Sequence, residues 1–273
     1  MITVNSTGGA MIEAKNLTKQ YGKIKAVNNI SFAVRHGEIF AFLGPNGAGK
    51  TTTIKMLTTL SKPTSGTMTL NGFDPVRNQA AARNSFGIVF QDPSLDEELT
   101  AYENMVLHGV LYNIPKPVQS QRIEMLLQLM QLWERKNDQV KKYSGGMKRR
   151  LEIARGLLHL PQILFLDEPT LGLDPQTRNL LWKHIRELNQ KEGITVFLTT
   201  HIMEEAERVA DTVAVIDHGE IIDRGSPREL AKRTGASSLE EAFLSLTGKT
   251  IRDEGPETFR QMAGQFLRRK RLK

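Results

Sequence analysis

Gly44-Pro45-Asn46-Gly47-Ala48-Gly49-Lys50-Thr51 is the stretch that decides the fold of this chain. It has the pattern G-x-x-x-x-G-K-[ST], whose glycines let successive backbone N–H groups point at phosphate oxygens. The apolar run Ile39–Leu43 predicts a buried strand before it, and Lys50–Leu57 predicts a helix whose N-terminus adds partial positive charge. This context disfavours the alternative, a glycine-rich turn that only caps a helix. We expect a nucleoside triphosphate site, with Lys50 on the outer phosphates, the Thr51 hydroxyl on Mg²⁺ and Thr52 in the binding set.

Length and composition exclude several other classes. With 273 residues the chain can bury a full core, and one large domain with subdomains is expected. It has no cysteine, which excludes disulfides and thiolate metal sites. No apolar run approaches the roughly 20 residues that span a bilayer, and residues 1–10 lack the apolar centre of a signal peptide. The protein is expected to be soluble or peripheral, so any membrane role needs a partner.

The net charge of +7 belongs mainly to one end of the chain. Residues 268–273 hold five positive charges, and removing them leaves +2 for the rest. The body therefore lacks the strong basicity typical of nucleic-acid binding, and no specific nucleic acid is expected as a partner. The basic tail is a candidate for contact with anionic lipid or nucleic acid; we favour the alternative, a solvated and disordered end.

The hydrophobic pattern predicts an α/β fold. Alternation in 11–36 and 66–73, with turns expected at Asn28-Asn29 and Asn71-Gly72, predicts a small antiparallel sheet beside the phosphate loop. Helical periodicity covers 100–133, interrupted at 113–115, and continues in 145–158. Beyond these, strands and helices alternate, which is typical of a parallel sheet covered by helices on both sides. The expected strands are 86–90, 163–166, 194–199 and 213–216; the expected helices are 176–188, 203–209 and 236–246, with poor order after Thr250.

Two acids follow the predicted strand 163–166. The carboxyl end of a buried parallel strand delivers the next side chains into the ligand crevice. Asp167 would hold Mg²⁺, directly or through water, and Glu168 would polarise the attacking water. Taken alone, this could be a strand that ends in a polar turn, but the upstream phosphate loop favours the site.

A second anion site is predicted where Ser144-Gly145-Gly146 opens a helix, because Ser144 is a good N-cap and two glycines leave the first amides uncovered. The segment 143–147 resembles the LSGGQ signature of the ABC ATPases, and Asp167-Glu168-Pro169-Thr170 is similar to their second nucleotide motif. Residues 11–235 follow that family's motif order. The resemblance implies a P-loop NTPase core with a mixed, mainly parallel sheet, an antiparallel β subdomain and a helical subdomain, at about 92–160.

The resemblance also implies roles for single residues. Tyr21 resembles the aromatic residue that stacks on adenine, and Gln91 resembles the Q-loop glutamine, with a catalytic and a metal-binding role. Asp174, in Leu171-Gly172-Leu173-Asp174, resembles the D-loop residue at the dimer interface. His201 resembles the switch histidine that contacts the γ-phosphate. With Lys50 and Glu168, Gln91 and His201 complete the expected catalytic set; Thr51, Gln91 and Asp167 are the expected metal ligands.

The signature departs from the family pattern at two positions. Met147 stands where glutamine is usual and Tyr143 where leucine is usual, whereas Ser144, Gly145 and Gly146 are intact. We therefore expect hydrolysis to be retained. The variant signature and the segment 238–248 resemble the drug-resistance (daunorubicin-type) exporter branch; 238–248 is also readable as an amphipathic helix that covers the body. Residues 236–273 are expected to form a C-terminal extension with a short helix and the basic tail.

The resemblance implies a mechanism and partners. Two chains would form a head-to-tail homodimer around two ATP molecules, with Ser144 and Gly146 of one chain facing the catalytic residues of the other. An integral membrane permease subunit would bind at 95–108, where Leu95 and Tyr102 are candidate contacts. It would receive the ATP-driven conformational change there. This contact would hold the chain at the cytoplasmic face of the cell membrane, powering substrate export.

Two other functional classes compete with this interpretation. A soluble ABC ATPase acting on ribosomes or nucleic acid would carry a second such domain or a long coiled coil. This chain has one set of motifs, and no heptads lie between Lys50 and Ser144. A non-catalytic regulatory module is the third class, and intact Glu168 and His201 argue against it.

Overall fold

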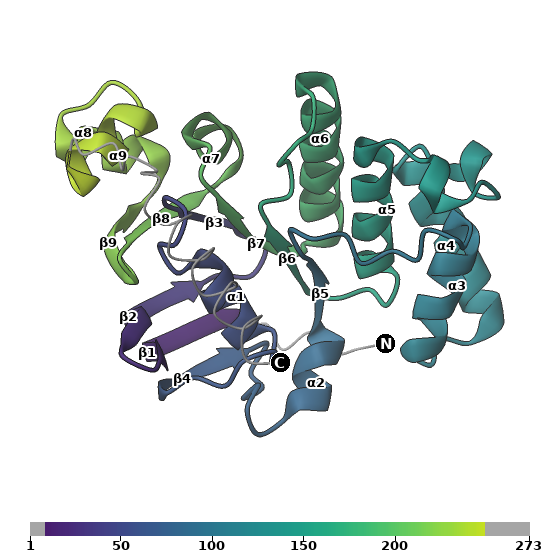
Figure 1. Ribbon diagram of the computed structural model, residues 1–273, viewed down its shortest axis with the longest axis horizontal. Helices are drawn as coiled ribbons and strands as arrows, with labels where there is room; N and C mark the ends of the chain where they lie inside the picture. Colours follow the sequence, from purple (N-terminus) through teal and green to yellow (C-terminus); the bar gives the residue numbers. More distant parts are fainter. Residues whose placement is uncertain (1–8, 249–273) are drawn as a thin grey trace, which may run out of the picture.

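The computed structural model describes residues 9–248, and these form two sheets with helices between and around them (Figure 1). The basic tail and everything else after Gly248 lie outside the described residues. The strands are β1 (Ile12–Tyr21), β2 (Ile24–Val34), β3 (Ile39–Leu43), β4 (Ser65–Leu70), β5 (Phe86–Val89), β6 (Ile163–Asp167), β7 (Thr195–Thr200), β8 (Thr212–Asp217) and β9 (Glu220–Gly225). The helices are α1 (Lys50–Leu57), α2 (Gln79–Ser85), α3 (Ala101–Leu111), α4 (Lys116–Leu129), α5 (Gly145–Leu157), α6 (Pro175–Glu192), α7 (Met203–Val209), α8 (Pro227–Thr234) and α9 (Leu239–Thr247), with short 3₁₀ turns η1 (Trp133–Arg135) and η2 (Val140–Lys142).

The larger sheet confirms the predicted parallel core. Its strand order is β5-β6-β7-β3-β8-β9, and each neighbouring pair is parallel except β8 and β9. Every residue of β3, β6 and β7 is buried, as expected for strands covered on both faces. Leu43 pairs with Thr200, and Asp167 pairs with Thr199. Parallel pairing therefore gathers the carboxyl ends of these three strands at one edge of the sheet.

The predicted antiparallel sheet is also present, with strand order β2-β1-β4. Helix α1 lies between the two sheets (Figure 1). Phe32 on β2 stacks on Phe40 of the large sheet with ring centroids 5.7 Å apart, and Phe40 stacks on Phe197 at 5.5 Å. This buried aromatic group joins the two sheets, because each ring contributes a large apolar surface and stacks in a favoured geometry.

The prediction of a turn at Asn28-Asn29 is wrong. Strand β2 runs through both residues, and Asn29 adopts a left-handed backbone (φ 53°) at an irregular part of the β1–β2 pairing. Its N–H is satisfied by the Thr18 hydroxyl at 3.0 Å. The hairpin turns instead at Gly22, with φ 57°. Asparagine tolerates this conformation in bulges as well as in turns, so the residue type alone misled the prediction. The other expected turn, Asn71-Gly72, is confirmed by positive φ at both residues.

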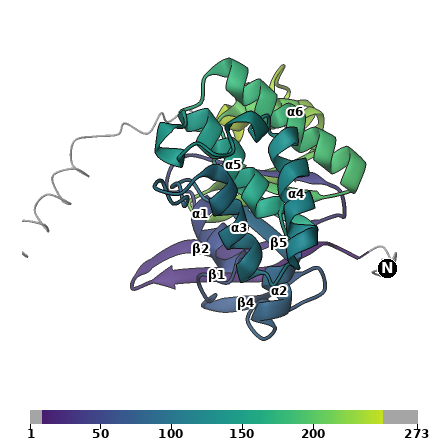
Figure 2. The ribbon, with the colours of Figure 1, turned by 90° about the vertical axis from the view of Figure 1, so that its right-hand side faces the viewer.

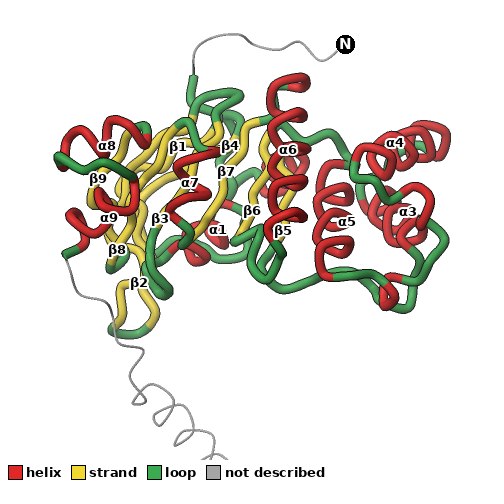
Figure 3. Tube along the Cα trace, turned by 90° about the horizontal axis from the view of Figure 1, so that it is seen from above, coloured by secondary structure: helices red, strands yellow, loops and turns green. Residues whose placement is uncertain are grey.

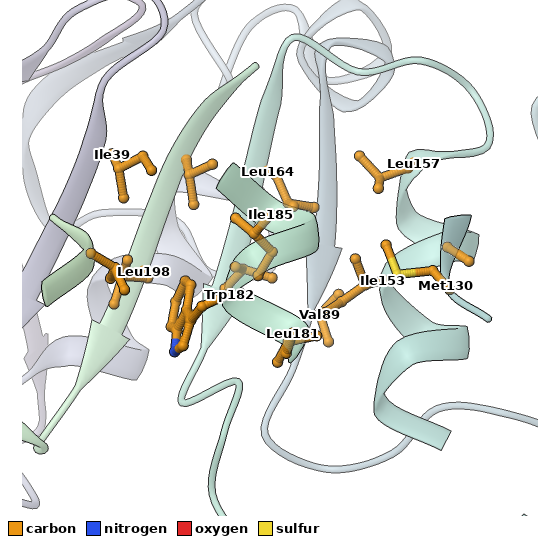
Figure 4. Packing of buried hydrophobic residues seen from close by; sticks show 14 of the residues in the cluster. Ile39, Val89, Met130, Ile153, Leu157, Leu164, Leu181, Trp182, Ile185 and Leu198 are labelled. Carbon is orange, nitrogen blue, oxygen red and sulfur yellow. The ribbon is translucent and has the colours of Figure 1, made fainter. Parts of the chain in front are cut away.

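Helices α5, α6 and α7 cover the face of the large sheet opposite to α1 (Figure 3). Figure 4 shows Leu181, Trp182 and Ile185 of α6 packed over Leu164 and Leu198 of the strands. Helices α3 and α4 pack on the outer side of α5, nearest the viewer in Figure 2. Figure 1 shows that they lie at the opposite end of the molecule from the antiparallel sheet. The break predicted at 113–115 separates them.

The described elements α2, β9 and α8 and the two 3₁₀ turns η1 and η2 were not predicted, and all are short. The expected helix at 236–246 is found as α9, which packs against α8 and α7. Leu239, Ala242 and Phe243 of α9 are buried in the main core. Within residues 9–248, no helix combines the length and apolar character that crossing a bilayer requires.

Candidate functional site

The phosphate loop joins the buried end of β3 to the N-terminus of α1. Gly49 caps α1 with φ 106°, and a side chain there would approach the backbone oxygen of Ala26 within 2.5 Å. Only glycine satisfies both conditions. The Lys50 ammonium is buried and donates to the backbone oxygens of Gly44 at 2.8 Å and Pro45 at 3.1 Å. The lysine is therefore folded back over the loop whose amides would cradle phosphate.

Thr51 and Asp167 meet at the carboxyl edge of the sheet. The Thr51 hydroxyl donates to Asp167 Oδ1 at 3.2 Å, and the buried Asp167 carboxylate also accepts from the Thr199 hydroxyl at 2.5 Å. Hydroxyl and carboxylate oxygens are the donor set that suits Mg²⁺. Among the residues described, no group of three or more His, Asp or Glu side chains forms a metal cage. The Thr51 hydroxyl and the Asp167 carboxylate fit an ion whose remaining ligands come from phosphate oxygens and water.

Glu168 brings the predicted catalytic residues together. Its Oε1 lies 3.3 Å from Lys50 Nζ, and its Oε2 lies 3.1 Å from His201 Nδ1. Burial lowers the pKa of Lys50, and the neighbouring Glu168 carboxylate partly offsets this effect. Glu168 has a left-handed backbone (φ 46°), which is uncommon outside glycine. Its N–H is held by the backbone and hydroxyl oxygens of Thr199, both at 3.1 Å.

These groups border a cavity of about 450 Å³, large enough for part of a nucleotide. Gln91, which follows β5, reaches the same cavity, as do Lys50, Glu168 and His201. The full lining is Ala26, Asn46, Gly47, Gly49, Lys50, Thr51, Thr52, Gln91, Glu168, Leu171 and His201. Tyr21 is not in this lining: it lies at the end of β1, half exposed, with Lys19 Nζ 4.9 Å from its ring centre.

The residues of the signature do not line the cavity of their own chain. Ser144 caps α5 by accepting from the Met147 N–H at 3.3 Å. Asp174 similarly caps α6, and its hydrogen bond from the Thr177 hydroxyl lowers its pKa. Thr177 also lies against Gly146, where an added Cβ would approach its methyl carbon within 2.5 Å. Asp174 and Gly146 are thus neighbours, joined through Thr177.

Sequence reasoning missed two buried charged groups around the site. Glu205 on α7 accepts hydrogen bonds from Thr170 Oγ1 at 2.6 Å, Trp182 Nε1 at 2.6 Å and Thr200 Oγ1 at 3.0 Å. It therefore holds the residue just before His201 and the turn just after Glu168. Arg149 on α5 pairs with Glu152 at 3.1 Å. The opposite charges at positions i and i+3 of one helix were the available signal for the second group.

Comparisons with known proteins agree with this geometry. The family model described as ABC transporter matches residues 27–171. The linearmycin resistance ATP-binding protein LnrL of Bacillus subtilis (strain 168) is 41% identical over 242 residues, covering 86% of this chain and 78% of that protein. A Nod factor export ATP-binding protein I from Ralstonia nicotianae is 43% identical over 220 residues, covering 81% of this chain and 68% of that protein.

Solved structures give the same result. The ATP-binding subunit of an ABC transporter superposes with a TM-score of 0.80 at 31% identity, covering 87% of this chain and 100% of that one. A dimeric ATP-binding cassette in a post-hydrolysis state, bound to ADP and Pi, superposes with a TM-score of 0.71 at 28% identity. That match covers 79% of this chain and 98% of the other.

Proposed function

This chain belongs to the ABC transporter family as an ATP-binding, ATP-hydrolysing subunit, and from that premise we propose that it powers export through a separate membrane subunit. The observation that carries the proposal is the convergence of Lys50, Glu168 and His201 beside Thr51 and Asp167. A phosphate loop alone would support nucleotide binding. A carboxylate held at the same cavity supports hydrolysis as well.

In the proposed reaction, each group has a distinct task. The loop amides and Lys50 hold the outer phosphates, and Glu168 polarises the water that attacks the γ-phosphate. His201 orients the Glu168 carboxylate and contacts the γ-phosphate, while Gln91 senses the nucleotide at the cavity wall. Thr51, Gln91 and Asp167 would hold Mg²⁺, which when bound neutralises phosphate charge. Tyr21 is proposed to stack on the adenine ring.

Completion of the site is proposed to come from a second copy of this chain. Ser144 caps α5, and Gly145 and Gly146 are its first residues, outside the cavity of their own chain. Their amides are therefore available to phosphate on another chain. A head-to-tail homodimer would place Ser144 and Gly146 opposite the partner's ATP, with Asp174 at the interface. The dimeric cassette bound to ADP and Pi supports this arrangement. ATP would close the dimer, and hydrolysis would reopen it.

The membrane subunit is proposed to dock at 95–108 and the adjoining face of α3. Leu107, Val110 and Leu111 are exposed there at spacings that put them on one face of the helix. Leu95 and Tyr102 are partly buried beneath this region. Such contact would keep the chain at the cytoplasmic face of the membrane, and the relatives' names, which specify resistance and export, support the outward direction.

We assign residues 11–235 to the ATPase domain, with its helical subdomain at about 92–160. Residues 236–273 form the proposed C-terminal extension, whose helix α9 packs on the body. For its basic tail, the charge pattern favours a solvated end over a contact with anionic lipid.

The experiment that tests this function is affinity purification of the tagged chain from detergent-solubilised membranes of its own cell, with copurifying proteins identified by mass spectrometry. We expect a stoichiometric integral membrane protein that is retained by the wild type and lost with Leu107→Glu/Leu111→Glu. The matched control is Met125→Glu, which places a charge on exposed α4. Recovery of ribosomes or nucleic acid without a membrane protein would refute the transporter assignment.

A further inference from the structure

All five N–H groups of the Arg149 guanidinium donate hydrogen bonds, four of them to backbone carbonyl oxygens. Nε donates to the Pro169 oxygen at 2.8 Å, and Nη2 donates to the oxygens of Asp167 at 3.0 Å and Glu168 at 3.2 Å. Nη1 donates to the Phe90 oxygen and to the Glu152 carboxylate. The side chain is 7% exposed. One residue of α5 therefore holds three consecutive carbonyls at the end of β6 and the carbonyl just before Gln91.

Glu152 extends this connection. One of its oxygens pairs with Arg149, and the other accepts from the Ser94 N–H at 2.9 Å. Arg155, one helical turn further, donates to the Ser94 backbone oxygen at 2.6 Å and to its hydroxyl. Glu152 thus neutralises the buried guanidinium while fixing the segment that follows Gln91.

We propose that Arg149, supported by Glu152, is a positioning residue that couples the orientation of α5 to the placement of Glu168 and Gln91; this rests on the proposed function. The left-handed backbone of Glu168 persists only if its surroundings hold it. Arg149 binds the carbonyl of Glu168 and those on either side. Because Ser144 begins the same helix, a tilt of α5 on engagement of a second chain would reach the hydrolytic carboxylate through this guanidinium.

The geometry distinguishes this role from that of a buried ion pair that only stabilises the core. A lysine would preserve the charge opposite Glu152, but its single ammonium carries three N–H groups on one nitrogen and cannot span four carbonyls from two segments. Arg149→Lys therefore separates charge from positioning. Arg122→Lys is the matched control, because Arg122 donates to the Leu158 oxygen at 3.2 Å between α4 and α5.

The test measures ATPase kinetics, nucleotide affinity and amide hydrogen exchange for wild type, Arg149→Lys and Arg122→Lys. For Arg149→Lys we expect ATP affinity within a few-fold of wild type but kcat lower by roughly 10- to 100-fold, because the catalytic group is misplaced. Peptides containing the Glu168 and Ser94 amides should exchange faster, with the rest of the chain unchanged. Arg122→Lys should match wild type in all three.

Normal kcat and normal exchange in a folded Arg149→Lys protein would overturn the proposal. If that variant does not fold, Arg149→Gln/Glu152→Gln removes both charges, and wild-type kcat in the double variant would overturn it equally. Absence of ATPase activity in the wild type would refute the proposed function, whereas faster exchange at Glu168 and Ser94 would still support the positioning role of Arg149.

Discussion

At the scale of single residues, Glu168 is the group on which the site converges. Its carboxylate lies between Lys50 and His201, and its main chain is held in a left-handed conformation by Thr199 on one side and Arg149 on the other. A side chain in the next position of a regular strand would point to the opposite face of the sheet. The unusual φ turns the carboxylate toward the cavity instead.

Glu168→Gln should lower ATP turnover by about two to four orders of magnitude while leaving ATP binding intact, because the amide cannot act as a general base. Turnover measured by phosphate release, with ATP affinity measured by calorimetry, checks this. Glu207→Gln, at an exposed position on α7, is the control and should hydrolyse ATP normally. Turnover near wild type in Glu168→Gln would exclude Glu168 as the base.

The placement of residues that follow buried strands could be predicted from sequence, whereas side-chain contacts to backbone carbonyls could not. Lys50, Thr51, Asp167 and His201 lie at the ends of parallel strands or at the helix start after one, so the topology alone brings them to one edge. Arg149 contacts carbonyls up to 59 positions away. Every residue carries a carbonyl, so such partners leave no mark in the sequence.

At the scale of elements, β5 and α5 approach each other through a pair of glycines. A Cβ on Gly87 would lie 2.1 Å from the Gly156 oxygen, whereas a Cβ on Gly156 would meet its neighbours at 3.6 Å or more. The first distance is impossible without moving the helix, and the second is an ordinary contact. This difference makes the two positions a matched pair.

Gly87→Ala should destabilise the protein by about 1–3 kcal/mol, as overpacking does. Gly156→Ala should be neutral or stabilise it by up to about 1 kcal/mol, because alanine is favoured over glycine in a helix. Urea unfolding of both variants beside wild type measures the difference. Equal stability of the two variants would contradict the close approach of β5 and α5.

Helices α3 and α5 also share a cluster that responds to acid. Burial lowers the pKa of both His108 and His159 from 6.5 to about 4, and the His159 ring stacks on Tyr112. The folded protein keeps both rings neutral between these pH values, where the unfolded chain takes up protons. Stability is therefore fully retained above about pH 6.5 and decreases as the pH falls toward 4.

His108→Gln/His159→Gln should reduce this loss, so that the unfolding midpoint in urea changes less between pH 7.5 and 5 than in wild type. An equally steep dependence in the double variant would show that other groups cause it.

Elements with a clear apolar pattern or a motif beside them could be predicted from sequence, whereas some short polar ones could not. Helices α5 and α6 carry enough turns for their apolar face to stand out, whereas α2 and α8 span two turns each. Asn29 misled the prediction because a bulge and a turn require the same left-handed backbone. Pairing across a sheet decides between them, and pairing is not visible in a local stretch.

At the scale of the whole molecule, the site is divided between two surfaces. Glu168→Gln should elute as a dimer with ATP and Mg²⁺ and as a monomer without nucleotide, because slow hydrolysis preserves the closed form. Adding Ser144→Arg should abolish the dimer by blocking the signature surface, while Gln190→Arg, on an exposed part of α6, should not. Light scattering after size exclusion measures the masses. A monomer at saturating ATP would contradict the proposed assembly.

The packing of α9 determines how far the C-terminus of this protein can be truncated without removing core residues. The predicted nucleotide-site residues end with His201, so a chain truncated at Gly235 would keep all of them. Ending there would strip Leu239, Ala242 and Phe243 from the core cluster that also holds Ala206 and Val209. Helix α7, which follows His201, would then expose an apolar face to solvent. A truncated version should precipitate during purification, and tags belong beyond Gly248.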